Sequence, residues 1–309
     1  MTLLKDLSSL VIDTADIGII ESLGASDVTT NPSLIYVASC DPSYQDIVSK
    51  ARRYVKNANP RKGERLSLFY DVLSVFFGVA IADVVSGAIA TQVDPRASFD
   101  TTATISRARR LVALYEEFGV ARERIRIKIA ATWEGIEAVR HLEDEGVRCI
   151  MTLMFSMPQA LAAADAGATA IAPYVGRVSD WNKNIHNVER HSSLNDDPGI
   201  CLVKKLQHTY RFFGIATNVL AASIRTSRHA LELAGVDALT VSPKVYKEIK
   251  DIKARKKALN FSSSPQKAST FDEESFKKML SGNRMAAELL LSGNHRFCAD
   301  AERLEKHFQ

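Results

Sequence analysis

The clearest pattern in the chain is an alternation of charged and aliphatic side chains between residues 124 and 130. Ile125, Ile127 and Ile129 share one face of this segment, and a period of two residues is typical of a β-strand. Lys128 lies on the other face. Thr132 then has the position of a helix N-cap, and a helical pattern continues to about residue 146. Lys128 is therefore expected near the carboxyl end of a strand that leads into a helix.

Similar short apolar segments recur along the 309 residues, separated by helical patterns. We expect eight strands, at residues 10–13, 27–30, 88–93, 124–130, 147–155, 169–175, 216–223 and 238–241. Strands that alternate with helices indicate a parallel sheet. Eight of them favour a closed (β/α)8 TIM barrel rather than two domains.

Two helical stretches differ from the short connections between the strands. Residues 33–86 are mostly helical, with a break at residues 57–63 where Asn, Pro and Gly cluster. After a loop at residues 260–269, a helical region covers about residues 273–308. We therefore expect an α/β fold with additional C-terminal helices, and we interpret residues 1–309 as a single domain.

The composition narrows the class of protein only moderately. A hydrophobic content of 46%, with 25% charged residues and a net charge of +4, is typical of a soluble globular chain. The basic run at residues 244–257 has helical spacing and few aromatic residues, so we interpret it as a solvated helix face and expect no nucleic-acid partner. We find no targeting segment and no run of about 18 apolar residues, so no membrane partner is expected.

The four cysteines are scattered at Cys40, Cys149, Cys201 and Cys298, without CxxC pairing. This spacing indicates neither a zinc site nor a disulfide framework. A reducing compartment follows, and we expect a cytoplasmic protein.

Polar side chains stand at or just beyond the carboxyl ends of the predicted strands. They are Asp13, Thr29, Asn31, Gln92, Lys128, Thr152, Ser223 and Arg225, and the matching position after residue 171 is Ala172. Active sites of (β/α)8 barrels form at this end of the strands. Each position alone is weak evidence, but their convergence on one rim predicts an active site there.

Lys128 is the candidate nucleophile of this site. An inward-facing lysine in a packed barrel is disfavoured in its charged form by desolvation, and the neutral amine is the form that attacks a carbonyl group. The alternative is a structural ion pair, with Asp13 or Asp94 as the partner.

Five segments carry a resemblance to a known family. They are DTAD at residues 13–16, TTNPSL at 29–34, KIAATWEG at 128–135, TLMFS at 152–156 and PYVGR at 173–177. They closely resemble the signature segments of the transaldolase family, in the same order and over nearly the whole chain. The resemblance implies a (β/α)8 enzyme, with no metal or organic cofactor, that moves a dihydroxyacetone unit between sugar phosphates through a lysine Schiff base.

The resemblance also implies roles for individual residues. Lys128 would be the nucleophile, Asp13 the general acid/base, and Thr152 would help to hold a catalytic water. Contacts with the substrate and its phosphate would come from Thr29, Asn31, Tyr174, Arg177, Ser223 and Arg225. A salt bridge at the rim with Asp180 is the alternative for the two arginines. The family likeness further suggests a homodimer.

Three positions depart from the family pattern. Transaldolases of this type carry glutamate, asparagine and serine where this chain has Gln92, Ile150 and Ala172. Glutamine can hydrogen-bond a water but cannot take its proton. Because unpaired polar groups weaken the binding of a sugar, the loss of a carboxylate, an amide and a hydroxyl favours a less hydroxylated or more apolar substrate.

Arg126 is a further oddity, because it shares a strand face with Lys128, where an aliphatic residue is usual. The guanidinium would lie below the lysine if this register holds. Alternatively it reaches solvent, or pairs with Asp27 or Asp94.

Three functions remain open at this point. The first is a transaldolase-like enzyme that acts on a small carbonyl substrate, expected to be a phosphorylated sugar. The second is a repurposed enzyme that catalyses a condensation or cyclisation in a specialised biosynthetic pathway. The third is a catalytically inactive paralogue with a binding role, against which the retained lysine argues.

Overall fold

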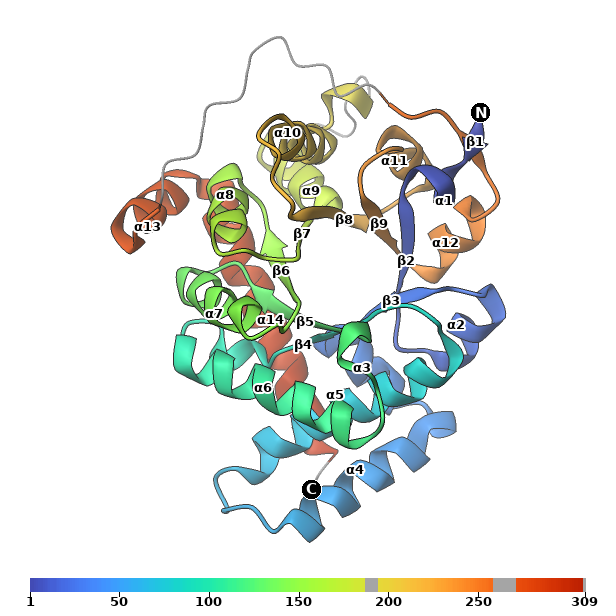
Figure 1. The fold of residues 1–309 in the computed structure, drawn as a ribbon, viewed down its shortest axis with the longest axis vertical. Helices are drawn as coiled ribbons and strands as arrows, with labels where there is room; N and C mark the ends of the chain where they lie inside the picture. Colours follow the sequence, from blue (N-terminus) through green and yellow to red (C-terminus); the bar gives the residue numbers. More distant parts are fainter. Residues whose placement is uncertain (187–193, 258–270, 308–309) are drawn as a thin grey trace.

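A computed structural model describes residues 1–186, 194–257 and 271–307. Its centre is a closed barrel of eight parallel strands (Figure 1). In order these are β2 (Ser9–Asp13), β3 (Asp27–Thr29), β4 (Ile89–Gln92), β5 (Ile125–Ala130), β6 (Cys149–Met154), β7 (Ala170–Pro173), β8 (Asn218–Ile224) and β9 (Ala238–Val241). The predicted TIM barrel is confirmed, and each expected strand lies within two residues of its observed ends. The single-domain interpretation stays a prediction.

Helices surround this barrel in Figure 1. Those that follow β2 to β9 are α2 (Ile17–Leu23), α3 (Pro32–Ser39), α4 (Gln45–Ala58), α5 (Arg65–Val84), α6 (Thr101–Glu117), α7 (Trp133–Asp144), α8 (Met157–Asp165), α9 (Val175–His186), α10 (Pro198–Phe212), α11 (Ser227–Glu232) and α12 (Pro243–Ile249). Many begin at a polar cap, as the sequence pattern predicts. The expected cap of α7 is present, because the Thr132 hydroxyl accepts a hydrogen bond from the Gly135 amide at 2.9 Å. The predicted loop at residues 260–269 lies outside the described residues.

We expected the basic run at residues 244–257 to form one helix, and this expectation is wrong. The helix α12 ends at Ile249, and β10 (Lys253–Ala254) pairs with β1 (Thr2–Leu3), next to α1 (Leu4–Leu7). Antiparallel backbone bonds to the N-terminal segment hold these residues extended, and helical spacing alone does not reveal such a distant partner. The pair ties the start of the chain to the segment after α12.

Apolar residues form two cores, one outside and one inside the barrel. The outer core packs the strands against the helices and includes Ile127, Ile129 and Phe69. The inner core contains small side chains such as Ala90 and Ala170. A (β/α)8 barrel is normally filled by bulky branched side chains, so small ones leave space within it.

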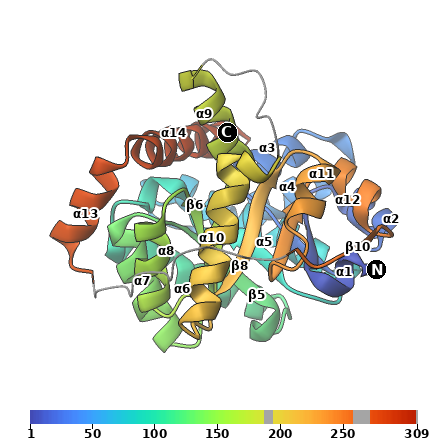
Figure 2. The same ribbon diagram turned by 90° about the horizontal axis from the view of Figure 1, so that it is seen from above.

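Two additional C-terminal helices are present, as expected: α13 (Glu273–Gly282) and α14 (Arg284–Lys306). Figure 2 shows α14 along one end of the barrel, beside α3 and α9, and it contacts α3, α9 and β6. Leu290 and Phe297 of α14 belong to the inner core. The helix therefore packs onto the end of the barrel where the strands terminate.

The helix α5 is long and apolar enough, by length and composition, to cross a membrane. The expectation that no such stretch exists is therefore corrected. Most of its apolar window is buried inside the protein, and Val72 and Phe77 belong to the outer core. The core helix of a soluble protein passes the same test, so this finding is weak evidence for a membrane span.

A buried ionic network links α5 and α6 to the end of β4. Arg107 bonds Asp71 at 2.8 Å and Asp94 at 2.9 Å, and neither carboxylate side chain is exposed. Burial raises the pKa of Asp71 to about 6, although Arg107 and Arg110 oppose this. The network anchors the backbone two residues beyond Gln92.

We predict that Arg107→Ala lowers the free energy of unfolding by about 3 kcal/mol, because it leaves two buried carboxylates short of a partner. Chemical denaturation measures this change. Arg109→Ala on the same helix is the control, since the Arg109–Glu145 pair is exposed and should contribute little. Equal effects of the two substitutions would contradict the assignment.

Candidate active site

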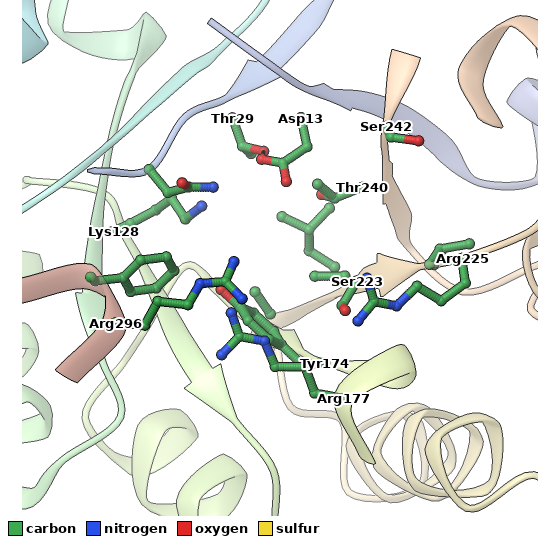
Figure 3. Close-up of a pocket in the computed structure, with 16 residues that line it drawn as sticks. Asp13, Thr29, Lys128, Tyr174, Arg177, Ser223, Arg225, Thr240, Ser242 and Arg296 are labelled. Carbon is green, nitrogen blue, oxygen red and sulfur yellow. Dashed lines mark hydrogen bonds between the residues drawn. The ribbon is translucent and has the colours of Figure 1, made fainter. Parts of the chain in front are cut away.

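A cavity of about 200 Å³ opens at the carboxyl end of the strands (Figure 3). Nine of the twelve site residues predicted from the sequence line it: Asp13, Thr29, Asn31, Lys128, Ala172, Tyr174, Arg177, Ser223 and Arg225. The other three, Gln92, Thr152 and Ile150, do not line this cavity. The barrel therefore brings most of the predicted residues together, although they come from five different strands or the segments that directly follow them.

Lys128 is buried, with 5% of its surface exposed. It lies on β5 between Gln92 of β4 and Ile150 of β6 in the strand register. Its Nζ donates to the Thr30 carbonyl oxygen at 3.0 Å. Within the described residues it has no salt bridge to Asp13, nor to Asp94, which instead pairs with Arg96 and Arg107.

Asp13 is held by the neighbouring strand. The Thr29 hydroxyl donates to Asp13 Oδ1 at 2.7 Å, and the two residues are paired in the register of β2 and β3. Asn31 caps α3 by accepting a hydrogen bond from the Leu34 amide at 3.1 Å. The carboxylate is thus fixed at the cavity wall, and Figure 3 shows Asp13 and Thr29 side by side.

Gln92, Thr152 and Tyr174 are buried polar side chains. The hydroxyl groups of Thr152 and Tyr174 are 2.9 Å apart. The Oε1 atom of Gln92 is buried and has no hydrogen-bond partner among the described residues. A buried acceptor without a donor calls for an explanation, such as a bound water or substrate group.

Two strands end with an unusual backbone. Leu153 on β6 and Ser223 on β8 have φ angles of 53° and 57°, which non-glycine residues seldom adopt. The strand register shifts at both places, between Met151 and Met154 and between Ala221 and Ile224. Such irregularities re-aim side chains beside functional sites, and here Ser223 lines the cavity.

Arg177 stacks on aromatic rings, with its guanidinium carbon 5.2 Å from the centre of Tyr174 and 5.8 Å from that of Phe297. Burial lowers the pKa of Arg177, and Arg296 and Arg225 add to the effect. A Cβ at Gly293 would lie 2.9 Å from Arg177 Nη1, so glycine at this position leaves room for the arginine.

Arg225 forms the salt bridge with Asp180 that was expected as an alternative, at 3.0 Å. Both side chains are 53% exposed, so the pair is weak, and Arg225 also lines the cavity. A Cβ at Gly176 would lie 2.5 Å from Arg225 Nε, which explains a small residue there. The structural and binding interpretations of Arg225 are therefore compatible.

Besides three apolar residues of β8, the sequence reasoning missed Thr240, Ser242, Arg296 and Phe297 among the residues that line this cavity. The first two could have been found, because the alternation along β9 that places Ala238 inward also places Thr240 and Ser242 inward. The other two come from α14, and no strand pattern identifies them. Arg296 adds a third guanidinium to those of Arg177 and Arg225 (Figure 3).

Arg126 and Ile150 line a second cavity, at the amino end of the strands. Arg126 Nη1 donates to the carbonyl oxygens of Glu123 at 2.7 Å and Ile125 at 2.9 Å. Among the described residues it forms no salt bridge with Asp27 or Asp94. The guanidinium thus lies toward the opposite end of the barrel from the active-site cavity.

This arrangement suits a reaction at the carbonyl group of a substrate that also carries an anionic group such as a phosphate. A buried amine, a fixed carboxylate and three guanidinium groups surround one space. The amine supplies a nucleophile, the carboxylate a proton acceptor, and arginine the planar fork that binds phosphate. In the described part of the chain, no group of three or more His, Cys, Asp or Glu residues is arranged to hold a metal ion.

Comparisons with known proteins agree with these features. The model of the family described as Transaldolase/Fructose-6-phosphate aldolase matches residues 10–308. The chain is 41% identical to a transaldolase of Protochlamydia amoebophila, over 98% of this chain and 95% of that protein. It is also 41% identical to transaldolases of Sus scrofa and of Trichormus variabilis, over 98% of this chain and 91% and 93% of those proteins.

We predict that sodium borohydride, added in the presence of dihydroxyacetone, attaches the reduced ketone to Lys128. An imine forms at an amine that the ketone can reach, and Lys128 is the one lysine among the described residues that line this cavity. Peptide mass spectrometry locates the adduct. Labelling that persists in Lys128→Ala would show that another amine reacts.

Proposed function

This chain belongs to the transaldolase/fructose-6-phosphate aldolase family, and from that premise we propose that Lys128 is the amine through which it transfers a dihydroxyacetone unit between sugar phosphates. The family places the chain in carbohydrate metabolism, in the pentose phosphate pathway. The observation that supports the assignment of Lys128 is its position, buried at the carboxyl end of β5 and open to a cavity with Asp13 and arginines.

The proposed reaction begins when the Lys128 amine attacks the ketone carbon of the donor. Loss of water gives a protonated imine. The bond between the next two carbons of the chain then breaks, and its electron pair moves toward the imine to form an enamine. The Asp13 carboxylate takes the proton of the neighbouring hydroxyl, so that an aldose leaves. The remaining enamine attacks the aldehyde of an acceptor, Asp13 returns the proton to the new hydroxyl, and hydrolysis frees the product ketose.

Formation and hydrolysis of the imine require proton transfers that the family assigns to a glutamate and a water. Gln92 cannot accept a proton. We propose that the unpaired Gln92 Oε1 and the hydroxyl groups of Thr152 and Tyr174 hold this water together. Tyr174 would donate and recover the proton, since its hydroxyl lies next to Thr152.

The phosphate of the substrate would bind among Arg177, Arg225 and Ser223. Arg177 is stacked and partly desolvated, which strengthens its interaction with an anion. Arg225 is more exposed and shared with Asp180, so we expect it to contribute less. Thr29 and Asn31 would contact the sugar hydroxyl groups from the other side of the cavity.

The substitutions in the site favour a donor with fewer hydroxyl groups. Ala172 lines the active-site cavity as an apolar surface, where a serine would offer a hydrogen bond. Ile150 is next to Lys128 in the strand register but lines the cavity at the amino end, so the preference for such a donor rests on Ala172. A ketone with fewer hydroxyl groups leaves fewer unpaired polar groups against Ala172.

A second candidate function keeps the lysine but changes the reaction. The apolar Ala172 and the carboxylate lost at Gln92 favour a condensation or cyclisation of another carbonyl compound. An inactive paralogue is the weakest candidate. Burying a lysine costs free energy, and a protein without catalytic activity has no need to retain such a residue.

We also propose that the protein is a cytoplasmic homodimer without nucleic-acid or membrane partners. The four cysteines form no disulfide with one another in the described structure, which supports a reducing compartment. Support for a dimer comes from the resemblance to transaldolases.

We predict that Asp13→Asn lowers kcat by about 10²- to 10⁴-fold, because the amide cannot accept the hydroxyl proton. Borohydride labelling of Lys128 should persist, since imine formation does not use Asp13 in this proposal. Asp16→Asn is a matched control, because asparagine still caps α2 as Asp16 does. Retained turnover in Asp13→Asn, together with complete loss in Lys128→Ala, would contradict the role of Asp13.

We predict that Ala172→Ser raises kcat/KM for a fully hydroxylated ketose phosphate by about 2- to 10-fold relative to a deoxy analogue, the size of one hydrogen bond. Steady-state kinetics with both substrates measures the ratio. Ala170→Ser is the matched control, because Ala170 lies on the same strand but lines the cavity at the other end of the barrel. An unchanged ratio in Ala172→Ser would refute the specificity argument.

A further inference from the structure

The barrel contains a second cavity, of about 370 Å³, at the amino end of its strands. Its walls include the small side chains Ala88, Ala90, Ala170 and Ala238. Barrel interiors of this fold are normally filled, so a cavity of this size at the end away from the active site is unusual. Its volume is in the range of small-molecule sites.

Two arginines line this cavity from adjacent strands: Arg126 on β5 and Arg148, directly before β6. Neither forms a salt bridge with any residue that the structure describes. Arg126 is half-buried, and only its Nη1 has hydrogen-bond acceptors, the backbone carbonyls of Glu123 and Ile125. Burial, and then the charge of Arg148, lower the pKa of Arg126, while Asp27 and Glu143 partly oppose this. An anion between the two guanidinium groups would relieve this repulsion.

Two carboxylates complete the lining from other strands, Asp27 on β3 and Asp237 before β9. Asp27 accepts from the Ala88 amide and the Ser26 hydroxyl, both at 2.8 Å. Asp237 accepts from the Val219 amide at 2.8 Å and forms a longer, partly exposed ion pair with Arg211 at 3.5 Å. Each carboxylate thus bonds a backbone amide of a neighbouring strand. Their remaining lone pairs are suited to hydroxyl donors, not to a second anion.

We propose that this cavity is a binding site for a small hydroxylated anion, whose phosphate or carboxylate group lies between Arg126 and Arg148 while its hydroxyl groups face Asp27 and Asp237. The arginines supply charge-assisted hydrogen bonds and the aspartates supply acceptors. The opposed charges orient the ligand in the cavity.

The new site adjoins the active site through two shared residues. Thr29 and Leu220 line both cavities. The Thr29 hydroxyl holds Asp13, and Arg126 is two residues before Lys128 on β5. A ligand in the second cavity therefore contacts the same strands that carry the lysine and the carboxylate.

Calorimetric titration of the full-length protein tests the proposal, with glycerol 3-phosphate and glycerate as probes and glycerol as the uncharged control. The titrations use an Arg177→Ala background, which weakens anion binding in the active site. We expect at least one of the two anions to bind. The one with the higher affinity shows whether the site prefers a phosphate or a carboxylate group. Adding Arg126→Leu or Arg148→Ala should weaken binding by about tenfold or more, the size of a hydrogen bond to a charged group.

Two controls make the result decisive. Arg109→Ala removes an equal charge from an exposed pair and should leave the affinity unchanged. Arg148 is exposed, so Arg148→Ala should fold even if Arg126→Leu does not. Absence of binding by both anions in the Arg177→Ala background, or an affinity that Arg148→Ala leaves unchanged, would overturn the proposal. Because binding is measured without turnover, either result is independent of the proposed catalytic function.

Discussion

The burial of one amine is the constraint on which the site depends. Lys128 lies inside a closed barrel, and its hydrogen-bond acceptor among the described residues is the backbone carbonyl of Thr30. Low polarity around an amine strengthens its interaction with a nearby carboxylate or substrate. Asp13 is held in place by Thr29 on the neighbouring strand, so the barrel register sets the distance between acid and amine. The chemistry of the site therefore follows from strand pairing.

The same architecture explains why this barrel has two open ends. Small side chains in the inner core leave space at both the carboxyl and the amino end of the barrel. At the carboxyl end, α14 adds Arg296 and Phe297 to the active-site cavity. At the amino end, Arg126 replaces the aliphatic residue that would usually close the interior. Small side chains inside the barrel thus account for both the altered active site and the second polar cavity.

Periodicity in the sequence predicted the barrel, its approximate strand boundaries and the polar residues at most strand ends, while the family resemblance added Tyr174 and Arg177. This succeeded because inward and outward positions alternate along each strand, so Lys128, Asp13 and Thr29 could be placed on one rim. The contribution of α14 could not be predicted, since a helix packs over the barrel end through contacts that no local pattern encodes. The end of the helix at Ile249 was missed for a similar reason, because β10 pairs with the distant β1. The alternation along a strand shows which side chains face the barrel interior. It does not show toward which end of the barrel the long Arg126 side chain extends, or which of the two cavities Ile150 lines.

The account rests on one claim, that a ketone unit passes through Lys128 from a donor to an acceptor. The most direct measurement follows the carbon skeleton of fructose 6-phosphate labelled in its first three carbons, incubated with an aldose phosphate acceptor and the wild-type protein or Lys128→Ala. The account predicts that the label appears in a new ketose phosphate with the wild type and not with the variant. Equal transfer by Lys128→Ala, or no labelled ketose with the wild type, would contradict it.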